Sequence, residues 1–209
     1  MLKSTRSIFP SLFKSTFVGG EGLLYQYAAI EKSTRFITNV GLITSNGSNG
    51  QNIMACEWTH HISYSPALIA VCIGPGKATH ENIQQSKEFG VSIASTDQIV
   101  LSSISGTTSA KSINKIKALE ELGFKFYKAK KIKTLMVKDS VLNAECKLIK
   151  EIKLGSHTMF IGEVIEFEVN TEKTPLALHQ GEYGKFETLP KTPKEEREEI
   201  NKILAKHKK

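Results

Sequence analysis

The distribution of apolar and polar positions between residues 35 and 169 predicts a chain built mainly from strands. Residues 35–44 are rich in β-branched and apolar side chains. The polar segment 45–50 that follows contains two Asn-Gly pairs, which suit the left-handed positions of a hairpin turn. Residues 67–73 form a continuous apolar run bounded by proline and glycine. This run predicts a strand covered on both faces, although periodicity alone does not exclude a buried helix.

Four later segments continue the strand pattern. They are residues 89–94, 141–152, 158–169 and 176–186, the last predicted as one closing strand. Six or seven strands, mostly antiparallel and with short helices between them, predict a mainly β fold, a β-barrel with helical decoration.

Short helices are predicted at three places inside this series of strands. Thr79 stands before a short polar stretch and is a good N-cap residue. Residues 97–103 predict a second helix, and residues 113–122 predict a third that ends at Gly123. The apolar stripe of the third helix consists of Ile113, Ile116 and Leu119.

The C-terminal segment predicts a helix with a sharp start. Thr192 is expected as N-cap, Pro193 at the first helical position and Glu195 as the capping-box residue. Its narrow apolar stripe, formed by Ile200, Ile203 and Leu204, favours a docked or dimer-contact helix over a membrane anchor.

Length and composition indicate one domain with appendages. We expect an N-terminal extension over residues 1–30, a barrel over residues 31–188 and a basic helix over residues 189–209. Apolar runs fall far short of the roughly 20 residues of a membrane span, and we expect neither an export signal nor a membrane partner. Three widely spaced cysteines argue against a disulfide framework or a zinc site and favour a reducing cytoplasm. The net charge of +7 is dispersed and lacks interleaved aromatic residues, which favours a solvated basic surface over a specific nucleic-acid site.

The segment from Gly74 to His80 is a candidate phosphate-binding turn. Its glycines free backbone amides, and the helix expected after it directs a positive dipole end toward an anion. The spacing matches neither a P-loop nor a dinucleotide fingerprint. Taken alone, the segment therefore fits a plain tight turn better than a phosphate site.

Five separated segments together give a stronger signal. These segments are Asn52–Trp58, Ile62–Pro66, Gly74–His80, Ser109–Lys111 with Lys115, and Gly155–Val164. In order and spacing they resemble the flavin-reductase-like FMN-binding split barrels, a family that includes flavoredoxin. The resemblance covers roughly residues 35–186. It implies a Greek-key split β-barrel with short inserted helices and a C-terminal helix, assembled as a homodimer with FMN near the subunit interface.

The resemblance also implies roles for individual residues. Residues expected to contact FMN are Asn52, Met54, Ala55, Cys56, Glu57, Trp58, Ser63, Thr79, His80, Ser109, Lys111 and Lys115. His157 is expected on the nicotinamide or acceptor side, with a plain turn histidine as the alternative. FMN is the expected flavin, FAD is the alternative, and NAD(P)H is the expected co-substrate. Ala55 departs from the family, which commonly has a hydroxyl residue there, and Glu57 adds a charge near the flavin edge.

Other side chains have less specific interpretations. Cys56 is expected as a small buried residue beside the flavin ring, with a redox thiol as the alternative. His60 and His61 are neighbours on a strand, so their side chains point to opposite faces, and no metal site is expected. The resemblance implies an NAD(P)H-dependent flavin or ferric-complex reductase. The alternatives are an electron-transfer protein that does not use NAD(P)H, or a ligand-binding barrel without redox activity.

Overall fold

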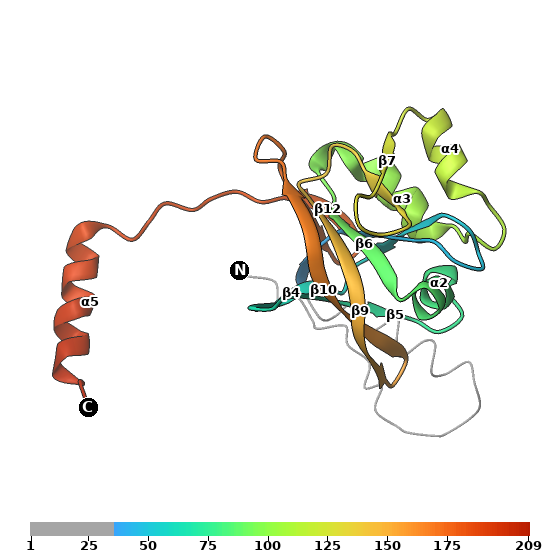
Figure 1. Ribbon diagram of the computed structural model, residues 1–209. Coiled ribbons are helices and arrows are strands. Elements are labelled where there is room, and N and C mark those ends of the chain that lie inside the picture. Colours follow the sequence, from blue (N-terminus) through green and yellow to red (C-terminus); the bar gives the residue numbers. More distant parts are fainter. Residues whose placement is uncertain (1–35) are drawn as a thin grey trace, which may run out of the picture.

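A computed structural model of the protein describes residues 36–209, so the predicted extension over residues 1–30 lies outside the described part. A seven-stranded antiparallel sheet forms the body, with strand order β3-β2-β6-β9-β10-β5-β4 (Figure 1). Its strands are β2 (Gly41–Ser45), β3 (Asn52–Cys56), β4 (Thr59–Tyr64), β5 (Ala67–Ile73), β6 (Glu88–Ile93), β9 (Leu142–Leu154) and β10 (His157–Val169). The mainly β fold predicted from the sequence is confirmed.

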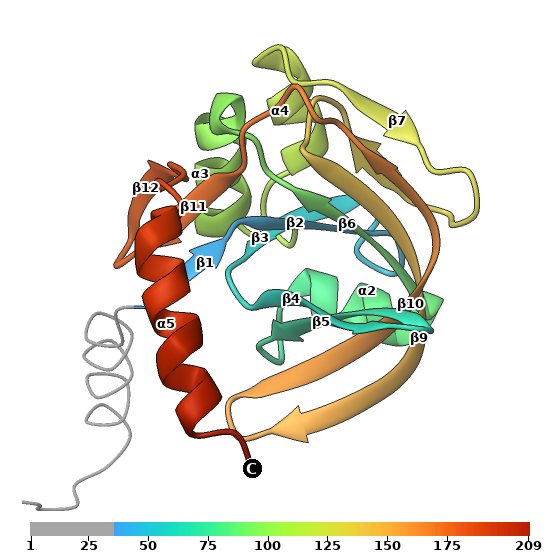
Figure 2. The ribbon, with the colours of Figure 1, turned by 90° about the vertical axis from the view of Figure 1, so that its left-hand side faces the viewer.

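The sheet has to curl because its two edge strands are consecutive in the chain. Only Glu57 and Trp58 separate β3 at one edge from β4 at the other. The backbone N–H of Cys72 in β5 donates to the carbonyl of Trp58 at 3.0 Å, which ties this connection to the far half of the sheet. Figure 2 shows the resulting barrel, with β4 and β5 lying below β2 and β3 and with β9 and β10 at its side.

Apolar side chains fill the interior of the barrel. Phe89 of β6 and Phe160 of β10 are fully buried there, together with Ile43 and Val71. A Cβ at Gly162 would lie 2.5 Å from the Phe89 ring, so only glycine lets β10 pass this side chain. Alternation along β10 therefore directs even-numbered residues 158–162 inward and His157, Met159 and Ile161 outward.

Helices cover the β3 side of the barrel with a second apolar cluster. They are α2 (Ala78–Ser86), the 3₁₀ turn η1 (Thr96–Gln98), α3 (Ile99–Thr107) and α4 (Lys115–Glu121). Leu101 of α3 and Leu119 of α4 are fully buried beside Ile53 of β3. The third predicted helix starts later than expected, because Asn114 caps it by accepting from the backbone N–H of Lys117. Ile113 precedes that cap and is 44% exposed, so the predicted stripe loses its first member.

Two sequence predictions about local structure are wrong. Thr79 is not an N-cap: α2 follows Lys77, whose backbone is extended, and Thr79 lies inside the first turn. The segment 176–186 is not one closing strand but a hairpin of β11 (Leu176–His179) and β12 (Glu182–Lys185). Gly181 takes a positive φ of 84° at its turn, a conformation that glycine adopts without strain.

Two small sheets complete the described fold. The hairpin of β11 and β12 pairs with β1 (Ile37–Asn39), so both ends of the domain meet in one three-stranded sheet. The second small sheet joins β7 (Phe126–Lys128) to β8 (Leu135–Val137). We call the sheet of β1, β11 and β12 the terminal sheet.

The C-terminal helix α5 (Lys194–Lys206) lies away from the barrel, at the end of an extended segment (Figure 1). Its N-cap is Pro193, one residue later than predicted, because Pro193 itself has an extended backbone. No residue of α5 is buried, so the helix is not docked on its own barrel. Dimer contact by this helix stays a prediction. None of the helices in the described part of the chain is long and apolar enough to cross a membrane.

Candidate functional site

A cleft of about 1340 Å³ opens where the barrel, the helices and the terminal sheet meet. Its walls come from the β3–β4 connection, the start of α2, the loop between α3 and α4, and the terminal sheet. Ten of the residues predicted for the site line it: Asn52, Met54, Ala55, Cys56, Glu57, Trp58, Thr79, Ser109, Lys115 and His157. These ten come from four separate stretches of sequence, which the fold brings together.

Strand β3 supplies one wall and a set of polar groups at its base. The side-chain amide of Asn52 donates to the hydroxyl of Thr79 at 2.8 Å, which links β3 to the first turn of α2. The other amide atom, Asn52 Oδ1, is buried without a hydrogen-bond partner among the described residues, as is Ser102 Oγ from α3. Both residues line the cleft. Both atoms have almost no accessible surface, so they lie within the wall of the cleft rather than at its surface. Unpaired buried polar atoms are costly to the fold.

The start of α2 gives the cleft one end whose groups suit an anion. Gly76 has a positive φ of 83°, which turns the chain so that Lys77 and the first turn of α2 face the cleft. The first backbone N–H groups of a helix have no partners within the helix, and its dipole is positive there. A phosphate would fit these donors together with the Thr79 hydroxyl.

Lys115 places a second positive charge at this end. Its side chain is almost completely buried, and Nζ donates to the carbonyl oxygens of Ser105 at 3.2 Å and Thr108 at 3.3 Å. Burial, followed by the nearby charge of Lys77, lowers the pKa of Lys115 from its ordinary 10.5 to about 8. Two lysines thus face one cleft, and neither forms an ion pair within the part of the chain that the structure describes.

Three of the predicted cofactor contacts lie elsewhere. Lys111 forms a 2.5 Å ion pair with Glu81 on the surface, and this hydrogen bond lowers the pKa of the Glu81 carboxyl. His80 is buried on the barrel side of α2, where Nε2 lies 2.9 Å from the Thr158 hydroxyl, and desolvation lowers its pKa. Ser63 lies near the outer end of edge strand β4 and does not line the cleft. Linear spacing placed these side chains near the site, but their elements direct them away from it.

His157 and Trp58 form one rim of the cleft. His157 is the first residue of β10 rather than a turn residue, and its Nδ1 lies 2.8 Å from the Ser156 hydroxyl. The Trp58 ring packs against it with centroids 4.6 Å apart and planes tilted by 51°. Trp58 is half exposed, so the two rings present an aromatic surface at the opening.

Cys56 packs as a small buried residue within the cleft wall. Its Sγ donates to the carbonyl of Cys72 at 3.4 Å, and burial raises the pKa of the thiol to about 11. A thiol with so high a pKa is a poor nucleophile, which favours the packing interpretation over the redox one. His60 lines the cleft while His61 packs on the Tyr64 ring. Among residues 36–209, no group of three potential metal ligands is found.

A family model described as the flavin reductase like domain matches residues 33–187, most of the chain. The chain belongs to this family. The match confirms the predicted resemblance, and with it the flavoprotein and oxidoreductase classes that the resemblance implied.

Individual relatives agree with this family. An uncharacterized protein of Archaeoglobus fulgidus is 32% identical over 120 residues, which are 57% of this chain and 66% of that protein. A ferric-chelate reductase (NAD(P)H) of the same organism is 26% identical over 134 residues, 61% of this chain and 73% of that protein. The NADH:FAD oxidoreductase SgcE6 of Streptomyces globisporus C-1027, solved in complex with NAD and FAD fragments, superposes with a TM-score of 0.68. It has 19% identity and covers 83% of this chain and 98% of that structure, so it shows the shared fold.

The cleft fits the flavin that a member of this family would bind. A flavin combines a flat ring with a polar chain and a phosphate, and the cleft combines an apolar strand wall with hydroxyls, helix amides and two lysines. The donor set is therefore of the right chemistry for a phosphorylated flavin.

Residues that reach the cleft from the ends of the domain were not predicted from the sequence. These are Phe36, Ile37 and Thr38 near β1, and Leu178, Gly181 and Tyr183 from the hairpin of β11 and β12. Lys77, Ser102 and Thr108 were not predicted either. Lys77 lies inside the candidate phosphate-binding segment Gly74–His80, so its positive charge could have indicated a role in binding an anion. The terminal sheet gave no such signal, because its strands pair over more than 130 residues of sequence.

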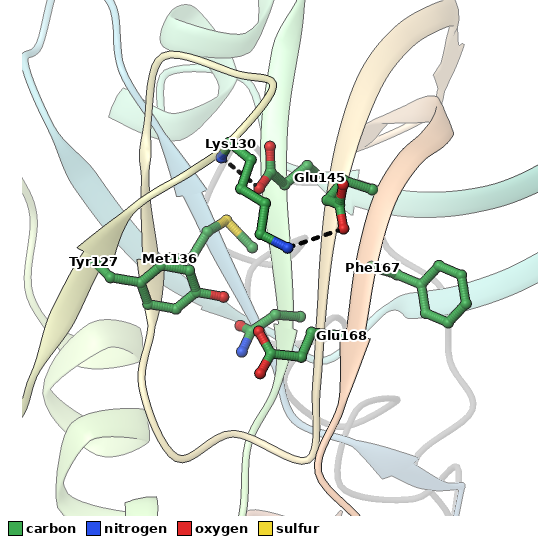
Figure 3. A pocket seen from close by; sticks show the side chains of 8 residues that line it. Tyr127, Lys130, Met136, Glu145, Phe167 and Glu168 are labelled. Atoms are coloured by element: carbon green, nitrogen blue, oxygen red, sulfur yellow. Dashed lines mark hydrogen bonds and ion pairs between the residues drawn. The ribbon is translucent and has the colours of Figure 1, made fainter.

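A second, much smaller pocket under the β7–β8 hairpin has a structural role (Figure 3). Its volume of about 10 Å³ is no larger than one water molecule needs. Glu145 of β9 accepts hydrogen bonds from the backbone N–H groups of Lys130, Lys131 and Ile132 at 2.7, 2.6 and 3.2 Å. Lys130 also pairs with Glu166 at 3.1 Å. These contacts fasten a basic loop to the barrel.

Proposed function

We propose that this protein is an NAD(P)H-dependent flavin reductase that binds FMN in the cleft and acts as a homodimer. The observation that carries the proposal is the end of the cleft where Lys77, the buried Lys115 and the first turn of α2 converge. Two cations and a positive helix end suit the dianionic phosphate of FMN. Glu81, the carboxylate in the first turn of α2, does not line the cleft and pairs with Lys111. FAD, whose phosphates are bridged, would place less charge at this end.

The strand wall would hold the flavin ring. Met54, Ala55 and Cys56 form its apolar surface, and the backbone of the edge strand β3 would offer amide groups to the ring edge. A bound flavin would supply the two-electron acceptor for hydride from a reduced nicotinamide, a transfer that needs no side-chain acid or base. The protein's work is to bind both rings, orient them and exclude water.

The His157–Trp58 rim would admit the nicotinamide. A volume of about 1340 Å³ exceeds the roughly 300–1,000 Å³ of a usual ligand pocket, so the cleft has room for a second ring system beside the flavin. The neighbouring aromatic faces of His157 and Trp58 suit stacking of a flat heterocycle. Ser156 holds the imidazole through Nδ1.

The proposal also includes the electron acceptor and the cellular compartment. Ferric complexes and free flavin are the proposed electron acceptors, and the ferric-chelate reductase relative supports the first of them. The three cysteines are free thiols, which supports a reducing cytoplasm.

Titration with FMN, FAD and riboflavin tests the binding site. FMN should bind one molecule per chain and more tightly than riboflavin, because only FMN carries the phosphate. Lys115→Met should narrow the preference for FMN, whereas Lys111→Met should preserve it because Lys111 lies outside the cleft. A protein that ignores all three flavins refutes the proposal.

Anaerobic mixing of the flavin-loaded protein with NADH and NADPH tests the reaction. Loss of the visible flavin absorbance should follow with at least one nicotinamide, and ferric citrate should restore it. His157→Ala should slow the loss while leaving FMN bound, with Ser63→Ala as the matched control outside the cleft. If neither nicotinamide reduces the flavin, the protein is not a reductase of this kind.

A further inference from the structure

Helix α5 has an apolar stripe without any surface of its own barrel to cover it. Ile200, Ile203 and Leu204 lie on one side of the helix and are 42, 49 and 63% exposed. The eight-residue segment 186–193 before the helix is exposed and extended, and it spans up to about 28 Å. That length would allow α5 to fold back on the barrel, yet the helix lies apart from it (Figure 1). Within residues 36–209, the stripe therefore has no surface that covers it.

The barrel has an apolar face that is likewise partly uncovered. His157, Met159 and Ile161 of β10 point outward and pair directly with Leu154, Ile152 and Lys150 of β9. Directly paired residues share a face of the sheet, so these six form one surface, which we call the outer hairpin face. Leu154 is 46% exposed, and Lys150 is exposed at the edge. Because His157 also lines the cleft, this face continues into the flavin site.

The two surfaces match in size and partly in charge. Glu196 lies one turn before Ile200 and Glu199 one turn before Ile203, so carboxylates beside the apolar stripe of α5 could meet Lys150, while Arg197 lies on the other flank of the stripe. A 13-residue helix is about 20 Å long, and the four strands from β9 to β4 span about 14 Å between the outer strand axes. One α5 helix is long enough to cross this half of the sheet.

We propose that α5 packs on the outer hairpin face of a second copy of this chain, where it forms a wall beside the partner's flavin cleft. In a two-fold dimer each copy gives one helix and receives one, so two equivalent contacts form. The stripe meets the apolar pairs of β9 and β10, and the glutamates meet Lys150. The inference rests on the proposed homodimer and adds the segment that crosses between the subunits.

Disulfide trapping between two distinguishable copies tests the contact. One copy carries Leu204→Cys in α5, and the other, with a mass tag, carries Leu154→Cys in the outer hairpin face. Mild oxidation should give a crosslinked heterodimer from this mixture. Lys202→Cys, on the opposite side of α5, should crosslink at least about tenfold less, and the parent chain controls for the native cysteines. A chain with both Leu204→Cys and Leu154→Cys that forms only an internal disulfide shows docking on its own barrel and overturns the proposal.

A second measurement does not depend on disulfide geometry. Leu204→Glu should raise the dimer dissociation constant at least about tenfold in analytical ultracentrifugation, and Lys202→Glu should change it less than about threefold. Equal dimer dissociation constants for the two variants overturn the proposal. A second result also overturns it: the parent sediments together with anionic vesicles and Leu204→Glu does not, which would show that the apolar stripe binds a membrane surface. Both experiments work without flavin. A protein that crosslinks but ignores FMN would refute the proposed function alone, and one that binds FMN but fails to crosslink would refute the α5 contact alone.

Discussion

Replacing Lys115 with methionine should change how the stability of the protein depends on pH. The Lys115 side chain is only 3% exposed and donates to the carbonyl oxygens of Ser105 and Thr108. Burial, and then the charge of Lys77, lowers its pKa from 10.5 to about 8. Because this pKa is lower in the folded chain, the unfolded chain binds more protons between pH 8 and pH 10.5. The contribution of Lys115 to the free energy of unfolding therefore rises with pH in this window, and the difference between parent and variant isolates it from the other titrating groups.

The size of the effect follows from the same shift. One pH unit is worth about 1.36 kcal/mol, so the charged Lys115 costs the folded protein about 3 kcal/mol at pH 7. Methionine removes this cost but also loses two hydrogen bonds worth about 1 kcal/mol each. We expect Lys115→Met to be about 1 kcal/mol more stable than the parent at pH 7 and about 2 kcal/mol less stable near pH 10.5.

Urea unfolding of parent and variant between pH 7 and pH 10 measures this difference. Lys111→Met is the control, because Lys111 is exposed and its ion pair with Glu81 should contribute less than about 1 kcal/mol. Parallel stability profiles for the parent and Lys115→Met would refute the reasoning. They would mean that the ammonium is solvated in the folded protein and does not serve as a buried cation of the cleft.

Three further changes probe other parts of the structure. Gly90→Ala should lower the free energy of unfolding in urea by about 2 kcal/mol, because the new Cβ would lie 2.6 Å from Met136 Sδ. An unchanged urea midpoint would mean that the Met136 side chain moves aside without a cost in stability. Glu145→Gln should cost about 2–3 kcal/mol in thermal unfolding, since one carboxylate accepts three backbone N–H groups; a loss below about 0.5 kcal/mol would contradict this anchoring role. Asn52→Ala should weaken FMN binding about tenfold by calorimetry, because it removes the hydrogen bond that holds the Thr79 hydroxyl at the cleft; unchanged affinity would place the flavin elsewhere.

Local sequence patterns were sufficient for the strands and for one wall of the cleft. The apolar run 67–73 corresponds to β5, and the alternating segment after residue 157 corresponds to β10. A strand that buries one face has apolar residues at every second position, so the alternation in β10 can be seen in the sequence. Met54 to Trp58 all line the cleft because they lie on and just after a single edge strand, so one correctly predicted strand brings them together, and their contact with a flavin stays a prediction.

The remaining errors share a physical cause. The direction of a side chain depends on where its helix starts, and α2 starts at Ala78, one residue before the predicted cap Thr79. On this helix Thr79 faces the cleft, whereas His80, the next residue, turns toward Phe160 and the barrel core. Lys111 and Lys115 look equivalent in the sequence, but Glu81 of α2 attracts the first to the surface. No pattern within residues 109–115 reports the position of that carboxylate.

Three residues that line the cleft carry groups that reduce the stability of the fold. Asn52 Oδ1 and Ser102 Oγ are buried without partners among the described residues, and Lys115 is held in a place that lowers its pKa. These residues belong to three different elements, β3, α3 and α4. Under the proposed function, the phosphate of FMN would pair with the charge of Lys115, whereas riboflavin would leave that charge unpaired. The burial of Lys115, which costs the fold stability, would then favour FMN over riboflavin.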